Sequence, residues 1–432
     1  MIRKPALQEG MKITKISVEG LFHTFNHEVL FNQEGIVIII GENGIGKTTI
    51  LKIINSIFSK KFDFLFSIDF NQIKIDFLEG QWLLYKDEDG CLVIKNKKKS
   101  ALFKVNPPRT DDGMQLYPHR FLSKIDEDEW YDRRRDVIVS REEIIHRYGY
   151  DLLGQTEEIP QWFDDVIKDN PVIFIQTQRI YKADYDRRRD GKMLKHMVKA
   201  YSDDLVILLQ QNNALFTTES IQLDSTFPIR LLRALQEKRS VDIENLIDEI
   251  TNLNKERTVL SSVGIIDKQH DEIINNLLKK VLKDPGALSI LDLYIEDNKK
   301  KLAVFKDTAR KLELLLGIIN RRFKHKKLFI DKKDGFIIKT EVESRDIDII
   351  NLSSGEQNEL IIFYNLLFKT KPNDLVLIDE PEISLHIAWQ QGLIADLKDI
   401  VKETGISLVI STHSPDIIGD NWSLVQTLSG NE

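Results

Sequence analysis

Gly41-Glu42-Asn43-Gly44-Ile45-Gly46-Lys47-Thr48 is the stretch of sequence that decides the fold. It matches the Gly-x4-Gly-Lys-Thr pattern, whose glycines let consecutive backbone N–H groups converge on phosphate oxygens. The run from Ile36 to Ile40 before it is continuously apolar and predicts a buried strand. After it, from Ile50 to Phe58, apolar residues recur at helical spacing. A glycine-rich loop between a strand and a helix is the setting in which a helix N-terminus binds phosphate.

Each position of this loop has an expected role. Lys47 should reach the β- and γ-phosphates of a nucleotide, and the hydroxyl of Thr48 should bind Mg²⁺, a hard cation that prefers oxygen ligands. The predicted nucleotide-binding residues are Asn43, Gly44, Ile45, Gly46, Lys47, Thr48 and Thr49. We therefore expect ATP and Mg²⁺ as ligands of this part of the chain.

The second half of the site is predicted where an apolar strand, Leu375 to Ile378, runs into Asp379 and Glu380. Ligands of open α/β sheets bind at the carboxyl ends of the strands. Asp379 is expected to hold Mg²⁺, and Glu380 to polarise the water that attacks the γ-phosphate. His413 follows the next apolar strand, Ser407 to Ile410, and is expected to hydrogen-bond the γ-phosphate as a sensor.

Two glutamines follow a further predicted strand, Pro171 to Ile175. Gln176 and Gln178 are both candidates for a residue that touches Mg²⁺ and the attacking water, and Gln178 is the preferred one. The catalytic set predicted from sequence is thus Glu380, His413 and Gln178, and the metal-binding set is Thr48, Asp379 and Gln178.

Composition describes an ordinary globular chain of 432 residues, 42% hydrophobic and 30% charged. A formal net charge of −7 argues against general coating of nucleic acid. Cys91 is the only cysteine, which excludes an intrachain disulfide and a cysteine-rich zinc site. No signal peptide and no apolar run long enough for a membrane span is evident, so we expect a cytoplasmic protein without a membrane partner.

The rest of the chain is predicted to alternate between strand-rich and helix-rich regions. Strands are expected at Gln72 to Phe77 and at Gln81 to Ile94, with a turn at Asp89-Gly90. The charged stretch from Pro118 to Asp169 is read as mostly helical. The pattern from Lys192 to Phe323 is helical almost throughout, and Arg257 interrupts its heptad seam. A short helical hairpin or bundle is therefore expected here rather than a long coiled-coil arm.

The C-terminal region is predicted to return to α/β alternation. A hairpin is expected between Lys327 and Val342, and helices are expected from Glu356 to about Phe368 and from about Ile387 to Val401. The predicted domains are 1–190, an ATP-binding lobe with a β-rich subdomain, 191–325, a helical insertion, and 326–432, a second ATP-binding lobe.

With these pieces in place, the chain resembles the ABC-type ATPases of the SMC and RecF-like group, and in particular AAA-type relatives in OLD-family proteins and bacterial anti-phage systems. Leu352-Ser353-Ser354-Gly355-Glu356-Gln357 resembles the ABC signature and lies 305 residues after Lys47. The other matching segments are Gly41 to Thr48, Gln178, Asp379 to His386, and Ser411 to Pro415. The resemblance implies an α/β P-loop ABC-type ATPase head, a mixed sheet with flanking helices, a β-rich subdomain and a helical insertion.

In such ATPases two heads enclose two nucleotides, and the signature of one head completes the phosphate site of the other. The resemblance therefore implies that Ser353 and the Gly355 amide contact the γ-phosphate in trans, within a homodimer or a higher even-numbered homo-oligomer. Ser354 stands where transporters usually have glycine, and His386 stands where their D-loop usually has aspartate. We expect an ATPase with slow turnover.

Partners are also implied by the resemblance. OLD-family nucleases carry a Toprim domain after the ATPase head, but 17 residues follow Pro415 here, so we expect any nuclease to be a separate effector chain, as in Septu and PARIS anti-phage systems. The alternative is an SMC/RecF-like DNA-repair or chromosome-maintenance ATPase that clamps DNA directly. Basic runs that could meet DNA are 95–99, 133–135, 187–189 and 324–327. A transporter subunit is disfavoured because its signature lies much closer to its phosphate loop.

Overall fold

The structure is a computed structural model. It describes residues 12–32, 34–107, 122–124, 129–132, 137–140, 159–176, 181–186, 191–236, 242–267, 285–383, 385 and 387–428. The chain divides into two compact units. Unit 1 comprises Met1–Thr177, Thr370–Ile383 and Gln390–Glu432, and unit 2 comprises Gln178–Lys369 and Ser384–Trp389. The boundaries of these two units differ from those of the three predicted domains, and the predicted domain boundaries stay a prediction.

Unit 1 has two large sheets. The first is parallel throughout, in the order β11-β17-β18-β3-β19. Its strands are β3 (Ile36–Ile40), β11 (Val172–Gln176), β17 (Leu375–Asp379), β18 (Ser407–Ser411) and β19 (Val425–Thr427). The second is antiparallel, in the order β2-β1-β4-β5-β6-β7. Its strands are β1 (Ile13–Leu21), β2 (Phe25–Leu30), β4 (Gln72–Phe77), β5 (Gly80–Lys86), β6 (Leu92–Asn96) and β7 (Ala101–Val105).

One helix joins these sheets in a common core. α1 (Lys47–Phe58) buries apolar residues around most of its circumference, among them Ile50, Leu51 and Ile54. These side chains share one hydrophobic cluster with residues of both sheets. The other helices of unit 1 are α2 (Asp63–Phe66), α4 (Gln161–Asp169), α12 (Leu393–Thr404), α13 (Pro415–Ile418) and the 3₁₀ turn η3 (Trp422–Leu424). The predicted α/β fold of the P-loop type is confirmed.

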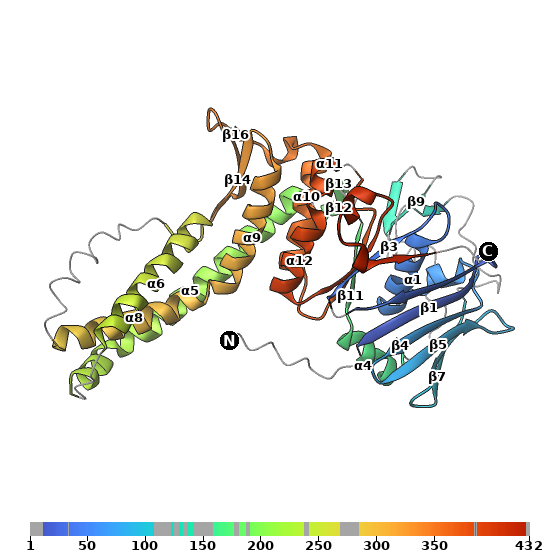
Figure 1. Cartoon of the computed structure of the whole chain (residues 1–432), viewed down its shortest axis with the longest axis horizontal. Coiled ribbons are helices and arrows are strands. Elements are labelled where there is room, and N and C mark those ends of the chain that lie inside the picture. The colour runs from blue at the N-terminus through green and yellow to red at the C-terminus, as the bar shows by residue number, and fades with distance from the viewer. Residues whose placement is uncertain are drawn as a thin grey trace. The chain divides into compact units, whose positions relative to one another are not determined.

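Unit 2 is dominated by long helices. α5 (Met197–Gln236) has 40 residues, so it is about 60 Å long. α5 and α6 (Ile243–Ser262) both pack against α8 (Pro285–Ala303), and the three run alongside one another (Figure 1). α9 (Lys306–Arg322) continues toward the hairpin of β14 (Lys326–Asp331) and β15 (Gly335–Thr340).

The remaining elements of unit 2 are mostly short. They are β12 (Tyr181–Asp186), β13 (Gly191–His196), β16 (Asp346–Ile347), η1 (Ile349–Asn351), α10 (Ser354–Tyr364) and a π-helical turn, η2 (Asn365–Lys369). α11 (Ile387–Gln390) spans the boundary of the two units. None of the helices in the described ranges is long and apolar enough to cross a membrane.

Two predicted elements differ in part from the described residues. Between 118 and 169, where helix was expected, the structure has the antiparallel strands β8 (Leu122–Lys124), β9 (Glu129–Asp132) and β10 (Val137–Ser140). Among the described residues of this stretch, helix is found in α4. Aromatic and β-branched residues such as Trp130 and Val137 favour strands, and the charged residues around them hid that preference. The helix predicted from Ile387 to Val401 is interrupted at Gln391-Gly392, and Gly392 is the N-cap of α12.

Candidate functional site

The glycine-rich loop joins the end of β3 to the start of α1. Gly46, the N-cap of α1, has a φ of +105°. A Cβ at this position would lie 2.8 Å from Leu21 Cδ2. The left-handed backbone and the close approach of Leu21 both require glycine here. The first N–H groups of α1 and the positive end of its dipole therefore follow the loop directly, which suits an anion.

Lys47 is held beneath this loop. Its side chain is 5% exposed, and Nζ donates hydrogen bonds to the carbonyl oxygens of Gly41 (2.8 Å) and Glu42 (2.9 Å). Burial lowers the pKa of Lys47, and the charges of nearby carboxylates oppose that shift. These carboxylates belong to Glu380, Asp379 and Glu382. The ammonium group thus lies between loop carbonyls and acids from the other end of the sequence.

Thr48 and Asp379 are directly hydrogen-bonded. Thr48 Oγ1 donates to Asp379 Oδ1 at 3.0 Å, and Ser411 Oγ donates to the same oxygen. β17 and β18 are parallel neighbours whose register pairs Asp379 with Ser411, so both residues lie at the carboxyl edge of the sheet. A hydroxyl and one carboxylate fit Mg²⁺, which binds few protein ligands and completes its shell with phosphates and water. Within the described residues no group of three or more His, Cys, Asp or Glu side chains could hold a metal without such help.

Glu380 has an unusual backbone. Its φ is +46°, a left-handed value that is strained for a residue with a side chain, at a cost of about 1–2 kcal/mol. The Glu380 N–H donates to Ser411 O at 2.9 Å, and Glu380 Oε1 lies 3.5 Å from His413 Nε2. Strained backbones of this kind cluster at functional sites. The carboxylate of Glu380 and the imidazole of His413 thus face each other at the sheet edge, and their roles as acid and sensor stay a prediction.

Glu382 positions the loop that carries His413. Glu382 Oε1 accepts hydrogen bonds from Thr412 Oγ1 (2.8 Å) and from the His413 N–H (2.7 Å). Sequence reasoning included Glu382 only within a matching segment, without a role. The ammonium group of Lys47 thus lies near three carboxylates at this edge of the sheet, together with His413. The carboxylates are those of Asp379, Glu380 and Glu382.

His27 is a second residue that sequence reasoning missed. It is 3% exposed on β2, and its Nε2–H donates to Ile45 O of the glycine-rich loop at 2.8 Å. Burial lowers the pKa of His27, and the hydrogen bond to Ile45 opposes the shift. His27 Nδ1 is buried without a hydrogen-bond partner. The only signal in the sequence is its alternation with Val29, which places both side chains on the inner face of the strand.

The signature segment begins α10 in unit 2. Ser353 is the N-cap, and with Glu356 it forms a capping box in which the Ser353 N–H donates to Glu356 Oε2 at 2.9 Å. Lys326 Nζ donates to the same oxygen at 2.9 Å. Gln357 Nε2 donates to Leu352 O at 2.8 Å. Hydrogen bonds to the side chains of Glu356 and Gln357 thus hold the turn that carries Ser353 at the start of α10.

The other predicted site residues differ in their exposure. Asn43 and Gly44 are exposed, Ile45 is buried and Thr49 is half-buried. Gly355 is buried in the first turn of α10. Ser353 and Gly355 belong to unit 2, whereas Lys47, Thr48, Asp379, Glu380 and His413 are brought together in unit 1.

The choice between the two glutamines stays open. Gln178, like His386, lies outside the described residues. Gln176 ends β11 and pairs in register with Asp379 of β17. The role of Gln178 at the metal and the attacking water therefore stays a prediction, and the backbone of Gln176 lies beside the acid that the predicted glutamine would accompany.

Comparison with known proteins gives a family match over most of the chain. The model of a protein family described as an AAA ATPase domain matches residues 11–418. The Retron Ec83 probable ATPase of Escherichia coli is 26% identical over 203 residues, which cover 42% of this chain and 35% of that protein. The chain therefore spans about a third of the length of that relative. The Ribose import ATP-binding protein RbsA of Clostridium tetani is 20% identical over 507 residues, covering 99% of this chain and 94% of the relative.

Two solved structures are similar at a low level. One is the Smc head domain of Pyrococcus furiosus with an extended coiled coil, bound to the C-terminal domain of ScpA, with a TM-score of 0.35 and 15% identity. It covers 97% of this chain and 94% of that chain. The other is the SMC head domain of Thermotoga maritima, with a TM-score of 0.34, 12% identity and coverage of 97% and 95%. TM-scores this low do not establish a common fold over the whole chain.

Proposed function

This chain belongs to the AAA ATPase domain family, and from that premise we propose that it binds ATP with Mg²⁺ and hydrolyses ATP at the carboxyl edge of the parallel sheet. The observation that carries the proposal is the 3.0 Å hydrogen bond from Thr48 to Asp379. It joins the end of the phosphate loop to the first acid after β17, although the two residues are 331 positions apart. Lys47, within reach of the same acids, would exchange its loop carbonyls for the β- and γ-phosphates.

The hydrolytic step is assigned to residues of unit 1. Glu380 would orient the attacking water and accept its proton, and His413 would donate a hydrogen bond to the γ-phosphate. Glu382 supports this arrangement because it holds the backbone of His413. Thr48 and Asp379 would hold Mg²⁺, which neutralises charge on the phosphates when it is bound, and Gln178 stays the predicted third residue at the metal and the attacking water.

We further propose that two copies associate head to head around ATP. Ser353 and the amide of Gly355 would then meet the γ-phosphate bound by Lys47 of the other copy, in a homodimer or a larger even-numbered oligomer. The capping box supports this role because it presents Ser353 at the positive end of an 11-residue helix. Each hydrogen bond to a charged phosphate contributes about 1.5–3 kcal/mol, so losing a few of them on hydrolysis would reopen the interface.

For the cellular role we propose a regulatory or scaffold subunit of a bacterial anti-phage complex that controls a separate effector nuclease. The support is the resemblance of the motif set to the ATPase subunits of Septu and PARIS systems. Partial similarity to a protein named as a retron ATPase is compatible with it. The alternative, a DNA clamp of the SMC/RecF type, has no stronger support in the fold or in the site.

The test of the proposal is steady-state phosphate release, combined with light scattering in ATP and in ADP. We expect measurable ATP turnover that requires Mg²⁺, and a doubling of mass with ATP when hydrolysis is blocked. Affinity purification from the native host would then identify the effector. A protein that binds no ATP at millimolar concentration would contradict the whole proposal, whereas an active monomer would contradict only the association around ATP.

A further inference from the structure

Glu356 places a negative charge at the end of α10 that is proposed to meet the γ-phosphate of another copy. It is the third residue of the helix, and its side chain is 9% exposed. Its Oε2 accepts the N–H of Ser353 at 2.9 Å, so the charge lies one hydrogen bond away from the residue expected at the phosphate. A carboxylate this close to a bound phosphate would repel it. The N-terminus of α10 therefore suits a phosphate only when the charge of Glu356 is neutralised.

Lys326 supplies the opposite charge. Its Nζ donates to Glu356 Oε2 at 2.9 Å, the same oxygen that accepts from Ser353. The side chain of Lys326 is 21% exposed, and Nζ also lies 5.9 Å from the centre of the Phe323 ring. Because the two charges of this ion pair cancel, the positive end of the helix dipole remains at the start of α10.

The backbone before Lys326 fixes the place of this ammonium group. His325 lies between the end of α9 and the start of β14 and has a left-handed φ of +62°. The Glu341 N–H donates to His325 O at 3.0 Å. A left-handed residue with a side chain persists only where its surroundings hold it. Successive side chains of a strand point to opposite faces, so Lys326 reaches α10 whereas Lys327 is exposed.

A second ion pair holds α10 to the same segment. Arg322, four residues before Lys326, pairs with Glu359, three residues after Glu356. Both side chains are almost fully buried, and Arg322 Cζ lies 5.2 Å from the centre of the Phe363 ring. This buried pair anchors the helix. The pair of Lys326 and Glu356 lies about one turn nearer to the N-terminus, at the end that is proposed to meet phosphate.

We propose that Lys326 is a positioning residue for the association around ATP: it neutralises Glu356 and so lets the N-terminus of α10 accept the γ-phosphate bound by another copy. The inference rests on the proposed association of two copies. Glu356 serves the capping box through its carboxylate oxygen, and glutamine can take the same place without the charge. The need for Lys326 should therefore disappear when the charge of Glu356 is removed.

An ion pair that only held the helix would behave differently. Replacing either partner of such a pair would weaken the association. If Lys326 acts by neutralisation, Lys326→Met should weaken the association, whereas Glu356→Gln should leave it equal or make it tighter. In Glu356→Gln the ammonium group of Lys326 would carry an unpaired positive charge near the phosphate. The two single changes thus have opposite expected signs.

Sedimentation with ATP and Mg²⁺ measures the association, in a Glu380→Gln background chosen to block hydrolysis. Lys326→Met should weaken the association about tenfold. The double change Lys326→Met with Glu356→Gln should bring it back to within about threefold of the parent. The ATP affinity of the monomer, measured by calorimetry, should be the same in all variants, because Lys326 acts on the nucleotide of another copy.

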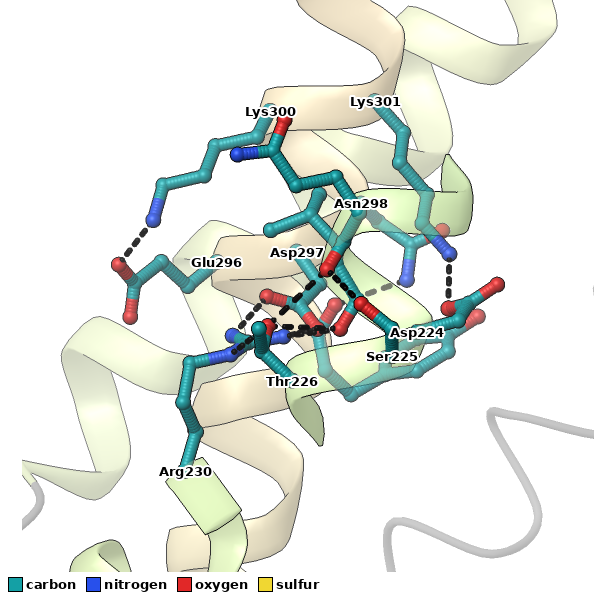
Figure 2. Close-up of polar contacts among 12 residues, drawn as sticks. Asp224, Ser225, Thr226, Arg230, Glu296, Asp297, Asn298, Lys300 and Lys301 are labelled. Carbon is teal, nitrogen blue, oxygen red and sulfur yellow. Dashed lines mark hydrogen bonds and ion pairs between the residues drawn. The ribbon is translucent and has the colours of Figure 1, made fainter. Parts of the chain in front are cut away.

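Two lysines provide matched controls for the loss of one positive charge. Lys327→Met changes the next residue, whose exposed side chain pairs with Glu341 at 3.5 Å. Lys300→Met changes an exposed residue of α8, which pairs with Glu296 at 2.7 Å (Figure 2). Both variants should associate like the parent. A loss in either control equal to that of Lys326→Met would show an effect of net charge and overturn the inference.

The remaining outcomes separate this inference from the proposed function. Association of Lys326→Met equal to that of the parent, or weakening in both single variants without recovery in the double variant, would overturn the inference and leave the association around ATP intact. A parent that stays monomeric with ATP would overturn both. If Lys326→Met does not fold, Glu356→Gln still decides: weaker association than in the parent contradicts neutralisation, and equal or tighter association supports it.

Discussion

Replacing Glu380 by glutamine removes one charge from the sheet edge and keeps the shape of the side chain. The Glu380 N–H would still donate to Ser411 O, and the left-handed backbone at φ +46° would carry the same strain. The fold should therefore be unchanged. An amide cannot accept a proton from water, so the variant should bind ATP and fail to hydrolyse it.

The magnitude follows from the position of the carboxylate. A positioned general base contributes about 10²–10⁴-fold, which corresponds to about 2.7–5.5 kcal/mol of barrier. We expect kcat to fall by about 10³-fold, in the middle of this range. Glu380 is also the foremost of the carboxylates that oppose the lowering of the Lys47 pKa. Removing its negative charge leaves Lys47 freer for phosphate, so ATP affinity should stay equal or become tighter.

The assay is steady-state phosphate release together with the lifetime of the ATP-bound dimer in light scattering. Glu380→Gln should lengthen that lifetime. Glu382→Gln is the matched control, because it removes a neighbouring charge but leaves the base in place. The kcat of Glu382→Gln should fall about tenfold, because its amide oxygen accepts weaker hydrogen bonds from Thr412 and His413. Turnover by Glu380→Gln within about threefold of the parent would remove Glu380 from the catalytic role.

Other expected outcomes test the remaining parts of the site. Lys47→Ala should weaken ATP binding by about 10²–10⁴-fold, since two charge-assisted hydrogen bonds of about 1.5–3 kcal/mol each are lost, and equal affinity in calorimetry would contradict the phosphate-loop assignment. Ser353→Arg should bind ATP normally but fail to associate with it, so dimers like those of the parent in light scattering would disprove the trans contact. Burial lowers the pKa of His27, so the folded chain keeps this side chain neutral at a pH where the unfolded chain is already protonated. The unfolded chain therefore binds more protons than the folded chain as the pH falls below about 6.5, which destabilises the fold. Thermal unfolding should therefore show that the parent loses stability between about pH 7.5 and about pH 5.5, and that His27→Gln loses less; identical pH dependence would refute this reasoning.

Local sequence predicted the centre of the fold well, because that centre is made of continuous apolar runs next to distinctive polar residues. Ile36–Ile40 was placed with its observed bounds, and β17 was placed to within one residue. Asp379 and Glu380 directly follow such an apolar run, so the pattern placed them at the carboxyl end of β17. Since parallel strands share a carboxyl edge, the proximity of Asp379 to Thr48 also followed from pattern alone.

Long-range contacts account for most of what the sequence did not reveal. His27 binds the carbonyl of Ile45, and nothing local distinguishes it from any inward-facing strand residue. The sequence pattern predicted helix in this region but not a single helix of 40 residues. Pro228 lies inside α5, where Arg230 donates to Leu223 O in the turn before it and pairs with Asp297 on another helix (Figure 2). In both places the decisive contact joins residues that are distant in the sequence or on different elements, so local pattern does not reveal it.

The charge balance at the sheet edge explains why the proposed site would need both Mg²⁺ and a second copy. Asp379, Glu380 and Glu382 lie around Lys47, so three negative charges face one positive charge. A triphosphate entering this region would meet a net charge of −2 unless a divalent cation neutralised it. The N-terminus of α1 offers only a partial positive charge to the same phosphates. The N-terminus of α10, with Ser353 as its cap, would add a second partial charge when contributed by another copy. Its effect would be greatest on the γ-phosphate, the group that is transferred to water on hydrolysis.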